Sequence, residues 1–312
     1  MKNILVPVDF SDYSKYAMEV AASIAKKHQA SIHVVHMMGL TDAVLTRDES
    51  QEVFEAMYHM KLTEKRFDEL LNVPYLEGVT VHQNVKNYTN FTEINDVAIS
   101  CDADLIVMGS HGSTGLKEVF VGSNTEKVVR TATTPVLVIK DHMPDFNLEK
   151  VVFACDFKGE NVDAFKQIRK LIKVLGAQME LLYVNLPGER FRSSIEIEDR
   201  IYKFFAQAGI EDLRPKDVNY YIDYTVEDGI FNYSFSNKAD AIAIPTHGRS
   251  GLAHFFAGNF LNKTLQLKIR KAIPVMVALI ACLFILRGLG LGIPYVSPKL
   301  NPQKIEAKME CH

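Results

Sequence analysis

The feature that most constrains the fold of this chain is one pattern that occurs twice. In the first copy, the apolar segment 103–107 (ADLIV) leads into a glycine turn at 108–112 (MGSHG), and Gly122 and Ser123 follow. In the second copy, residues 239–259 repeat the apolar segment, the turn and the later glycine with changes. A buried strand, a glycine turn and a helix start are typical of α/β proteins that bind phosphate.

The similarity between the two halves extends beyond this pattern. A shift of 147 residues aligns 4–10 with 151–157 and 30–37 with 177–184, and a shift of 136 aligns the glycine turns. At 312 residues the chain is long enough for two domains with separate cores. We therefore predict a domain at 1–140, a linker at 141–148, a second domain at 149–277 and an atypical tail at 278–312.

Within each half, short apolar runs alternate with helical patterns, as in βαβ units with a parallel sheet. The fold class predicted is α/β, with two tandem Rossmann-like domains, each a five-stranded parallel sheet with helices on both faces. In the first half the expected strands are 3–8, 31–37, 79–85, 104–108 and 135–139, and the expected helices are 13–27, 50–71, 90–100 and 123–131.

Charge and cysteine content argue against one class of function, nucleic-acid binding, and favour one cellular location. Residues 1–149 carry 13 Lys and Arg against 21 Asp and Glu, and most of the basic excess of the rest lies in 263–312. Residues 1–262 contain no basic cluster, so we do not expect nucleic-acid binding. The four cysteines show no C-x-x-C spacing, and no signal peptide precedes the first strand, which favours a cytoplasmic location.

Three features are expected at the carboxyl ends of the predicted strands, where open parallel sheets bind ligands. Asp9 follows the first strand, Met37 ends the second, and the glycine turn follows the fourth. Glycine suits such a turn because it adopts positive φ freely and leaves room for a phosphate oxygen. Ser123 then begins a helix, whose free N–H groups favour an anion, although a Gly-Ser pair can also be a simple cap.

At these residues the chain resembles tandem members of the universal stress protein family. The family motif G-x2-G-x9-G-[ST] is present as Gly109, Gly112, Gly122 and Ser123. The resemblance is strong over about 1–140 and weaker over about 149–277. It implies a Rossmann-like fold of the adenine nucleotide alpha hydrolase type that binds ATP or AMP, with Mg²⁺ as a possible companion of the phosphates.

The resemblance also implies a role for each site residue. The adenosine end would be held by Asp9 and the backbone of Met37, the ribose by Met108 and Gly109, and the phosphates by Gly112, Gly122, Ser123 and Asn124. Two such domains in one chain would form an intramolecular pseudo-dimer, and homo-oligomers are compatible with the pattern.

The second copy departs from the motif. Pro245 replaces Gly109, which removes an N–H group and fixes φ, and Asn259 replaces Ser123. Gly248, Gly258 and Asp156 remain. We therefore expect one standard nucleotide site, in the first domain, and a degenerate second site.

No catalytic constellation accompanies the motif, so we predict binding without an enzymatic role, although slow ATP hydrolysis is compatible with the sequence. His111 and His247 lie inside the glycine turns, where local packing explains them better than general-base chemistry. Two functions remain open: a nucleotide-binding stress or regulatory protein, and a nucleotide-independent interaction module formed by the pseudo-dimer. A membrane-tethered regulator that uses the tail is a weaker third alternative.

The tail does not fit the family. The expected strand at 273–277 lies within residues 272–286, which are all apolar or proline. This apolar run is shorter than the roughly 20 residues that span a bilayer. A buried or partner-covering extension is favoured over membrane contact. The third alternative is a disordered or aberrant terminus, for instance one produced by a reading-frame change.

Overall fold

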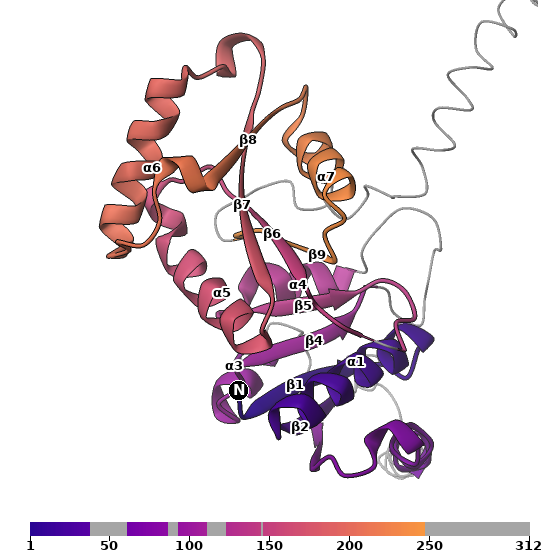
Figure 1. Ribbon diagram of the computed structural model, residues 1–312. Helices are drawn as coiled ribbons and strands as arrows, with labels where there is room; N and C mark the ends of the chain where they lie inside the picture. The colour runs from indigo at the N-terminus through magenta and orange to yellow at the C-terminus, as the bar shows by residue number, and fades with distance from the viewer. Residues whose placement is uncertain (38–60, 87–92, 111–122, 145, 247–312) are drawn as a thin grey trace, which may run out of the picture. The chain divides into compact units, whose positions relative to one another are not determined.

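The structure is a computed structural model that describes residues 1–37, 61–86, 93–110, 123–144 and 146–246. These residues form two parallel sheets in succession along the chain (Figure 1). The strand order is β3-β2-β1-β4-β5 in the first sheet and β8-β7-β6-β9 in the second. The predicted α/β class with parallel sheets is confirmed, and the strand expected at 273–277 lies outside the described residues.

The first sheet contains the strands that the sequence predicts, with bounds within two residues of those expected. They are β1 (Asn3–Val8), β2 (Ser31–Met37), β3 (Val81–Lys86), β4 (Leu105–Gly109) and β5 (Val136–Ile139). The helices are α1 (Asp12–His28), a helical segment at 61–71, α3 (Glu93–Ser100) and α4 (Ser123–Thr131), with a 3₁₀ turn η2 (Pro74–Leu76) before β3. The start of the helix expected at 50–71 lies outside the described residues.

Alternation along β1 shows that helices cover both faces of the first sheet. Ile4 and Val6 pack in a cluster with α1 and with Phe67 of the helix 61–71. Leu5 packs in a separate cluster with side chains of α3 and α4. All three β1 side chains are fully buried, and burying each contributes about 1.5–3 kcal/mol. The period of two along the strand therefore produces the three-layer arrangement.

The second sheet repeats this plan with four strands. They are β6 (Lys150–Ala154), β7 (Gln178–Asn185), β8 (Val218–Ile222) and β9 (Ala241–Ala243). The helices are α5 (Val162–Leu175), α6 (Ser194–Ala208) and α7 (Val226–Ser236), with 3₁₀ turns η3 (Gly159–Asn161), η4 (Gly188–Arg190) and η5 (Pro215–Asp217). Phe153 of β6 packs with α5 and α6, and Val152 packs with α7 on the other face.

The repeat in the sequence is also a repeat in the backbone. Three residues with positive φ in the first half have a counterpart with positive φ in the second, at the shifts of 147, 147 and 136 residues that align the sequences. The pairs are Phe10 and Phe157 (φ 63° and 51°), Gln29 and Gly176 (53° and 77°), and Asp102 and Lys238 (46° and 54°). Since non-glycine residues adopt this conformation at a cost, its recurrence shows that both halves share one backbone design.

In each sheet, an aspartate carboxylate accepts hydrogen bonds from the backbone at the start of β1 or β6. Asp104 Oδ2 accepts the backbone N–H groups of residues 2–3, at 2.5 and 3.3 Å. Asp240 Oδ2 accepts those of residues 149–150, at 2.9 and 2.8 Å. Both aspartates directly precede the strand that pairs with β1 or β6, so they have a structural role at the edge opposite the predicted ligand site.

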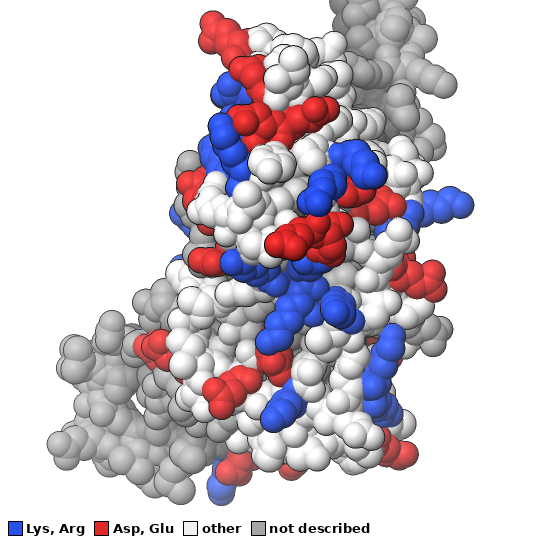
Figure 2. Space-filling view, turned by 60° about the vertical axis from the view of Figure 1, so that its left-hand side comes forward, with Lys and Arg blue, Asp and Glu red and all other residues white. Residues whose placement is uncertain are grey.

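Charges of both signs are interspersed on the face shown in Figure 2. Elsewhere in the described residues, exposed ion pairs lie within single helices, such as Lys203 with Asp199 at 2.6 Å, and Lys15 with Asp12 at 3.0 Å. Such exposed pairs contribute little to stability. Among the described residues, no helix is both long enough and apolar enough to cross a membrane.

The repeat gives a prediction with its own control. Gln29 ends α1 in the left-handed conformation and is exposed, whereas its counterpart Gly176 ends α5 with open space around the position of a Cβ. We expect Gln29→Gly to raise the free energy of unfolding by about 1 kcal/mol and Gly176→Ala to lower it by about 1 kcal/mol. Urea denaturation of both variants measures this, and a destabilised Gln29→Gly would contradict it.

Candidate functional site

The predicted site residues of the first domain follow or end neighbouring strands of one sheet. Asp9 follows β1, Met37 is the last residue of β2, and Gly109 is the last residue of β4. The order β2-β1-β4 places these three positions along one edge. The chain proceeds outward from β1 to β2 and β3 and then crosses to β4 on the other side of β1, so β1 and β4 flank a topological switch point.

Asp9 is held in a fixed orientation by the first turn of α1. Its Oδ1 accepts the backbone N–H of Ser11 at 3.1 Å, the Ser11 hydroxyl at 2.6 Å and the hydroxyl of the buried Ser14. The Ser11 hydroxyl also accepts the Ser14 N–H, which makes Ser11 the N-cap of α1. These three donors hold the Asp9 carboxylate at the amino end of α1.

Phe10 separates Asp9 from the helix cap and adopts positive φ. Its ring lies 4.5 Å from the His36 ring and 5.2 Å from Phe67, and the Arg66 guanidinium lies 5.7 Å from its centroid. These contacts anchor a backbone conformation that costs about 1–3 kcal/mol. The left-handed turn directs Phe10 into this cluster and leaves Asp9 and Ser11 at the sheet edge.

Gly109 is needed for a reason other than the one expected from the sequence. Its φ is not in the left-handed region, since it is the last residue of β4. A Cβ at this position would lie 2.7–2.8 Å from the Cβ and the backbone of Tyr13 in α1. The freedom of glycine to adopt positive φ therefore does not explain Gly109, and the glycine instead allows the first turn of α1 to approach β4.

Two hydrogen bonds connect the end of β4 to its neighbours. The Thr125 hydroxyl, in the first turn of α4, donates to the carbonyl of Gly109 at 2.9 Å, and the N–H of the buried Ser110 donates to the carbonyl of Ile139 in β5 at 2.8 Å. The start of α4 is thereby held beside the carboxyl end of β4. The free backbone N–H groups at the start of α4 can donate hydrogen bonds to an anion at this edge.

The remaining predicted site residues are placed as follows. Ser123 and Asn124 are the first two residues of α4, and Met108 is buried in β4 beneath the edge. Gly112 and Gly122 lie outside the described residues, as do Met38 and His111. The sequence did not predict that Ser14 would bind Asp9 or that Thr125 would bind the Gly109 carbonyl. A serine at position 11, three residues before Ser14, is a helix-cap signal that could have indicated the first of these contacts.

The corresponding carboxylate of the second domain has different partners. Asp156 Oδ1 accepts the amide of Asn161 at 2.8 Å, and its Oδ2 pairs with the Lys158 ammonium at 3.2 Å. Lys158 and Asn161 stand at the positions of Ser11 and Ser14. The carboxylate charge is thus compensated by a cation from its own chain.

Other parts of this second edge also differ. The side chain of the buried Asn185, at the end of β7, accepts the backbone N–H of Arg192 at 3.1 Å and donates to its carbonyl at 2.9 Å, which closes the loop between β7 and α6. Pro245 is buried where β4 has Gly109, and β9 has only three residues against five in β4. Proline cannot donate to the ladder, which agrees with the shorter strand.

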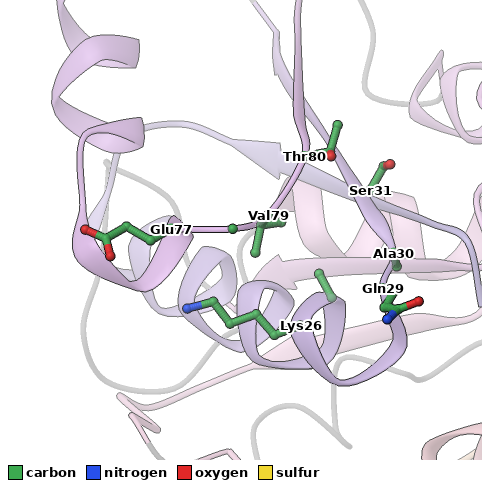
Figure 3. A pocket seen from close by; sticks show the side chains of 9 residues that line it. Lys26, Gln29, Ala30, Ser31, Glu77, Val79 and Thr80 are labelled. Atoms are coloured by element: carbon green, nitrogen blue, oxygen red, sulfur yellow. The ribbon is translucent and has the colours of Figure 1, made fainter.

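A cavity of about 460 Å³ lies at the opposite edge of the first sheet (Figure 3). It is lined by the end of α1, the start of β2 and the segment that precedes β3. The lining residues include Lys26, Gln29, Ser31, Glu77 and Thr80. Since it adjoins the amino ends of the strands, it is separate from the edge that carries Asp9 and Gly109.

The strand order and the residues at the switch point define a Rossmann-like α/β domain. Residues 1–140 match the Universal stress protein family. The chain is 34% identical over 143 residues to universal stress protein MJ0531 of Methanocaldococcus jannaschii, covering 45% of this chain and 82% of that protein. It is 31% identical over 153 residues to MJ0577 of the same organism, covering 45% of this chain and 94% of that protein.

The chain therefore belongs to the universal stress protein family. A crystal structure of a universal stress protein from Archaeoglobus fulgidus matches the fold with a TM-score of 0.54 at 19% identity. The match covers 78% of this chain and 86% of the other, so it extends over both sheets, and it concerns the fold alone.

The contact at Gly109 gives a direct test of this geometry. Gly109→Ala places a Cβ against the backbone of Tyr13, so we expect α1 or β4 to shift and the free energy of unfolding to fall by about 1–3 kcal/mol. Gly78→Ala is the control, since no atom lies within 4 Å of its added Cβ and only its positive φ costs energy. A Gly109→Ala variant with unchanged urea denaturation would contradict the close approach.

His36 gives a prediction on pH. Burial lowers the pKa of His36 below its ordinary value of 6.5, and the nearby Arg66 charge lowers it further, although the Val8 carbonyl and Asp9 act in the opposite direction. As the pH falls below 6.5, the unfolded chain therefore binds the proton first and the folded state loses stability. We expect His36→Tyr, which copies Tyr183 of the second domain, to reduce this loss in thermal unfolding between pH 7.5 and 5. An unchanged pH profile would contradict it.

Proposed function

We propose that this universal stress protein is a regulatory protein that binds ATP or AMP mainly through its first domain. The observation that carries the proposal is the pairing of an oriented carboxylate, Asp9, with the start of α4 at the same switch-point edge. The carboxylate can accept a hydroxyl or amino group of an adenosine, and the helix start can accept the phosphates.

The proposed contacts run along this edge from the adenosine end to the phosphate end. Asp9 and the backbone of Met37 take the adenosine end, and Met108 and Gly109 flank the ribose. The phosphates, with Mg²⁺ as a companion, are assigned to the loop and helix residues Gly112, Gly122, Ser123 and Asn124.

The second domain is proposed to lack an ordinary nucleotide site. A carboxylate that already has Lys158 and Asn161 as partners must lose an ion pair before it can bind a ligand hydroxyl. Pro245 adds a ring where the first domain has no side chain. Both differences disfavour adenosine at this edge.

We further propose that the protein acts by binding and not by turnover, in the cytoplasm, as an intramolecular pseudo-dimer of domains 1–140 and 149–277. The nucleotide would then act as a signal whose presence changes what the protein contacts.

A second candidate function is an interaction module that works without nucleotide. The ion-paired Asp156 and the buried Pro245 favour it for the second domain. Gly122→Leu separates the two functions, because a bulky side chain at the motif should remove nucleotide binding alone. If partner binding in cell extracts is lost together with nucleotide binding, the first function holds, and if it is retained, the second does.

The repeat supplies matched variants for the nucleotide site. We expect Asp9→Ala to weaken ATP binding at least about tenfold, which corresponds to a loss of about 1.4 kcal/mol, and Asp156→Ala to leave it unchanged. Isothermal titration of the full-length chain with ATP and Mg²⁺ measures both affinities. Absence of binding by the unmodified protein at millimolar ATP, or equal effects of the two variants, would overturn the proposal.

A further inference from the structure

Two histidines lie side by side on neighbouring strands of the first sheet, away from the nucleotide edge. His33 of β2 and His82 of β3 are direct partners in the parallel register, and their ring centroids are 4.8 Å apart with an interplanar angle of 26°. His33 is half-buried and His82 is exposed, so solvent reaches the pair. Among the described residues, neither ring makes a hydrogen bond or an ion pair.

The sheet fixes the distance between these side chains. Ile32 and Val34 point into the core beneath α1, so His33 between them points to the opposite face. β3 is the outermost strand, which places the pair at the open side of that face. Backbone pairing on both sides of His33 and His82 prevents the two positions from separating without loss of the strand.

This spacing suits a shared metal ion. With metal–nitrogen distances of about 2.0–2.1 Å and an angle between square-planar and tetrahedral, two imidazole ligands have ring centroids about 4.4–5.1 Å apart. The register pairing brings both imidazoles within reach of one ion, since their ring centroids lie 4.8 Å apart even before the side chains rotate. Rotation of the two side chains is still required, since stacked rings direct their nitrogens in parallel and not at one point.

We propose that His33 and His82 bind one divalent transition-metal ion of the type that prefers imidazole, such as Cu²⁺, Ni²⁺ or Zn²⁺. Neutral imidazole is the ligand form, and it predominates above the ordinary histidine pKa of about 6.5. The described residues offer no third His, Cys, Asp or Glu ligand, so water fills the other coordination positions. Bound metal would link the edge strand β3 to β2.

The experiment uses the full-length chain without a histidine tag, freed of metal and nucleotide, and titrated with NiCl₂ at pH 7.5. We expect one saturable site whose affinity falls at least about tenfold in His82→Gln and in His33→Gln, because each variant removes one of two preorganised ligands. The double variant should bind Ni²⁺ about as weakly as either single variant, since one remaining imidazole cannot chelate the ion.

His142→Gln is the control, because this exposed histidine pairs with Glu19 on a different surface and its loss should leave Ni²⁺ binding unchanged. The electron paramagnetic resonance spectrum of bound Cu²⁺ should show two coordinated nitrogens in the unmodified protein and one fewer in each single variant. Ni²⁺ affinity of His82→Gln within about twofold of the unmodified protein would overturn the proposal. This variant changes an exposed side chain, so it decides the question even if His33→Gln unfolds. Neither measurement involves nucleotide, so its outcome is independent of the proposed function.

Discussion

The first domain depends on the close approach of α1 to the end of β4. A Cβ at Gly109 would lie only 2.7–2.8 Å from the Cβ and the backbone of Tyr13, so any side chain there requires α1 or β4 to shift. The same first turn of α1 contains the Ser11 cap and Ser14, which orient Asp9. A single steric requirement thereby fixes the distance between the carboxylate beside β1 and the strand end from which the motif loop departs. The absence of a side chain at Gly109 is therefore explained by packing alone.

Comparison of the two domains separates what the fold requires from what the ligand requires. Both sheets share the strand order around the central strand, the carboxylate at its start and the left-handed residues at equivalent positions. They differ where the ligand would bind: α1 starts at Asp12 directly after its cap, whereas a 3₁₀ turn precedes α5, and Asp156 is paired with Lys158. These differences lie at the edge of the proposed site, and they are the physical basis for proposing a nucleotide in the first domain only.

Much of this fold could be predicted from the sequence, because buried strands with a regular apolar pattern have few alternatives. The strand bounds of the first domain and the switch-point position of Asp9 follow from that pattern. The reason for Gly109 could not, since a close approach between α1 and β4 depends on packing between segments almost 100 residues apart. The positive φ of Phe10 also had no local signal, because phenylalanine disfavours it, and only the ring contacts with His36 and Phe67 explain it. The loop-closing role of Asn185 similarly rests on hydrogen bonds that residue type alone does not indicate.

The left-handed phenylalanines recur with the same ring geometry in both halves. Phe10 meets Phe67 edge-on at 5.2 Å and 86°, and Phe157 meets Phe204 at 5.3 Å and 83°. A phenylalanine with positive φ is unfavourable by itself, so each ring must gain enough from its aromatic partners to hold the turn. The turn is therefore anchored from the core and not from the carboxylate beside it. The residue two positions after that carboxylate, serine in one half and lysine in the other, can differ while the backbone stays the same.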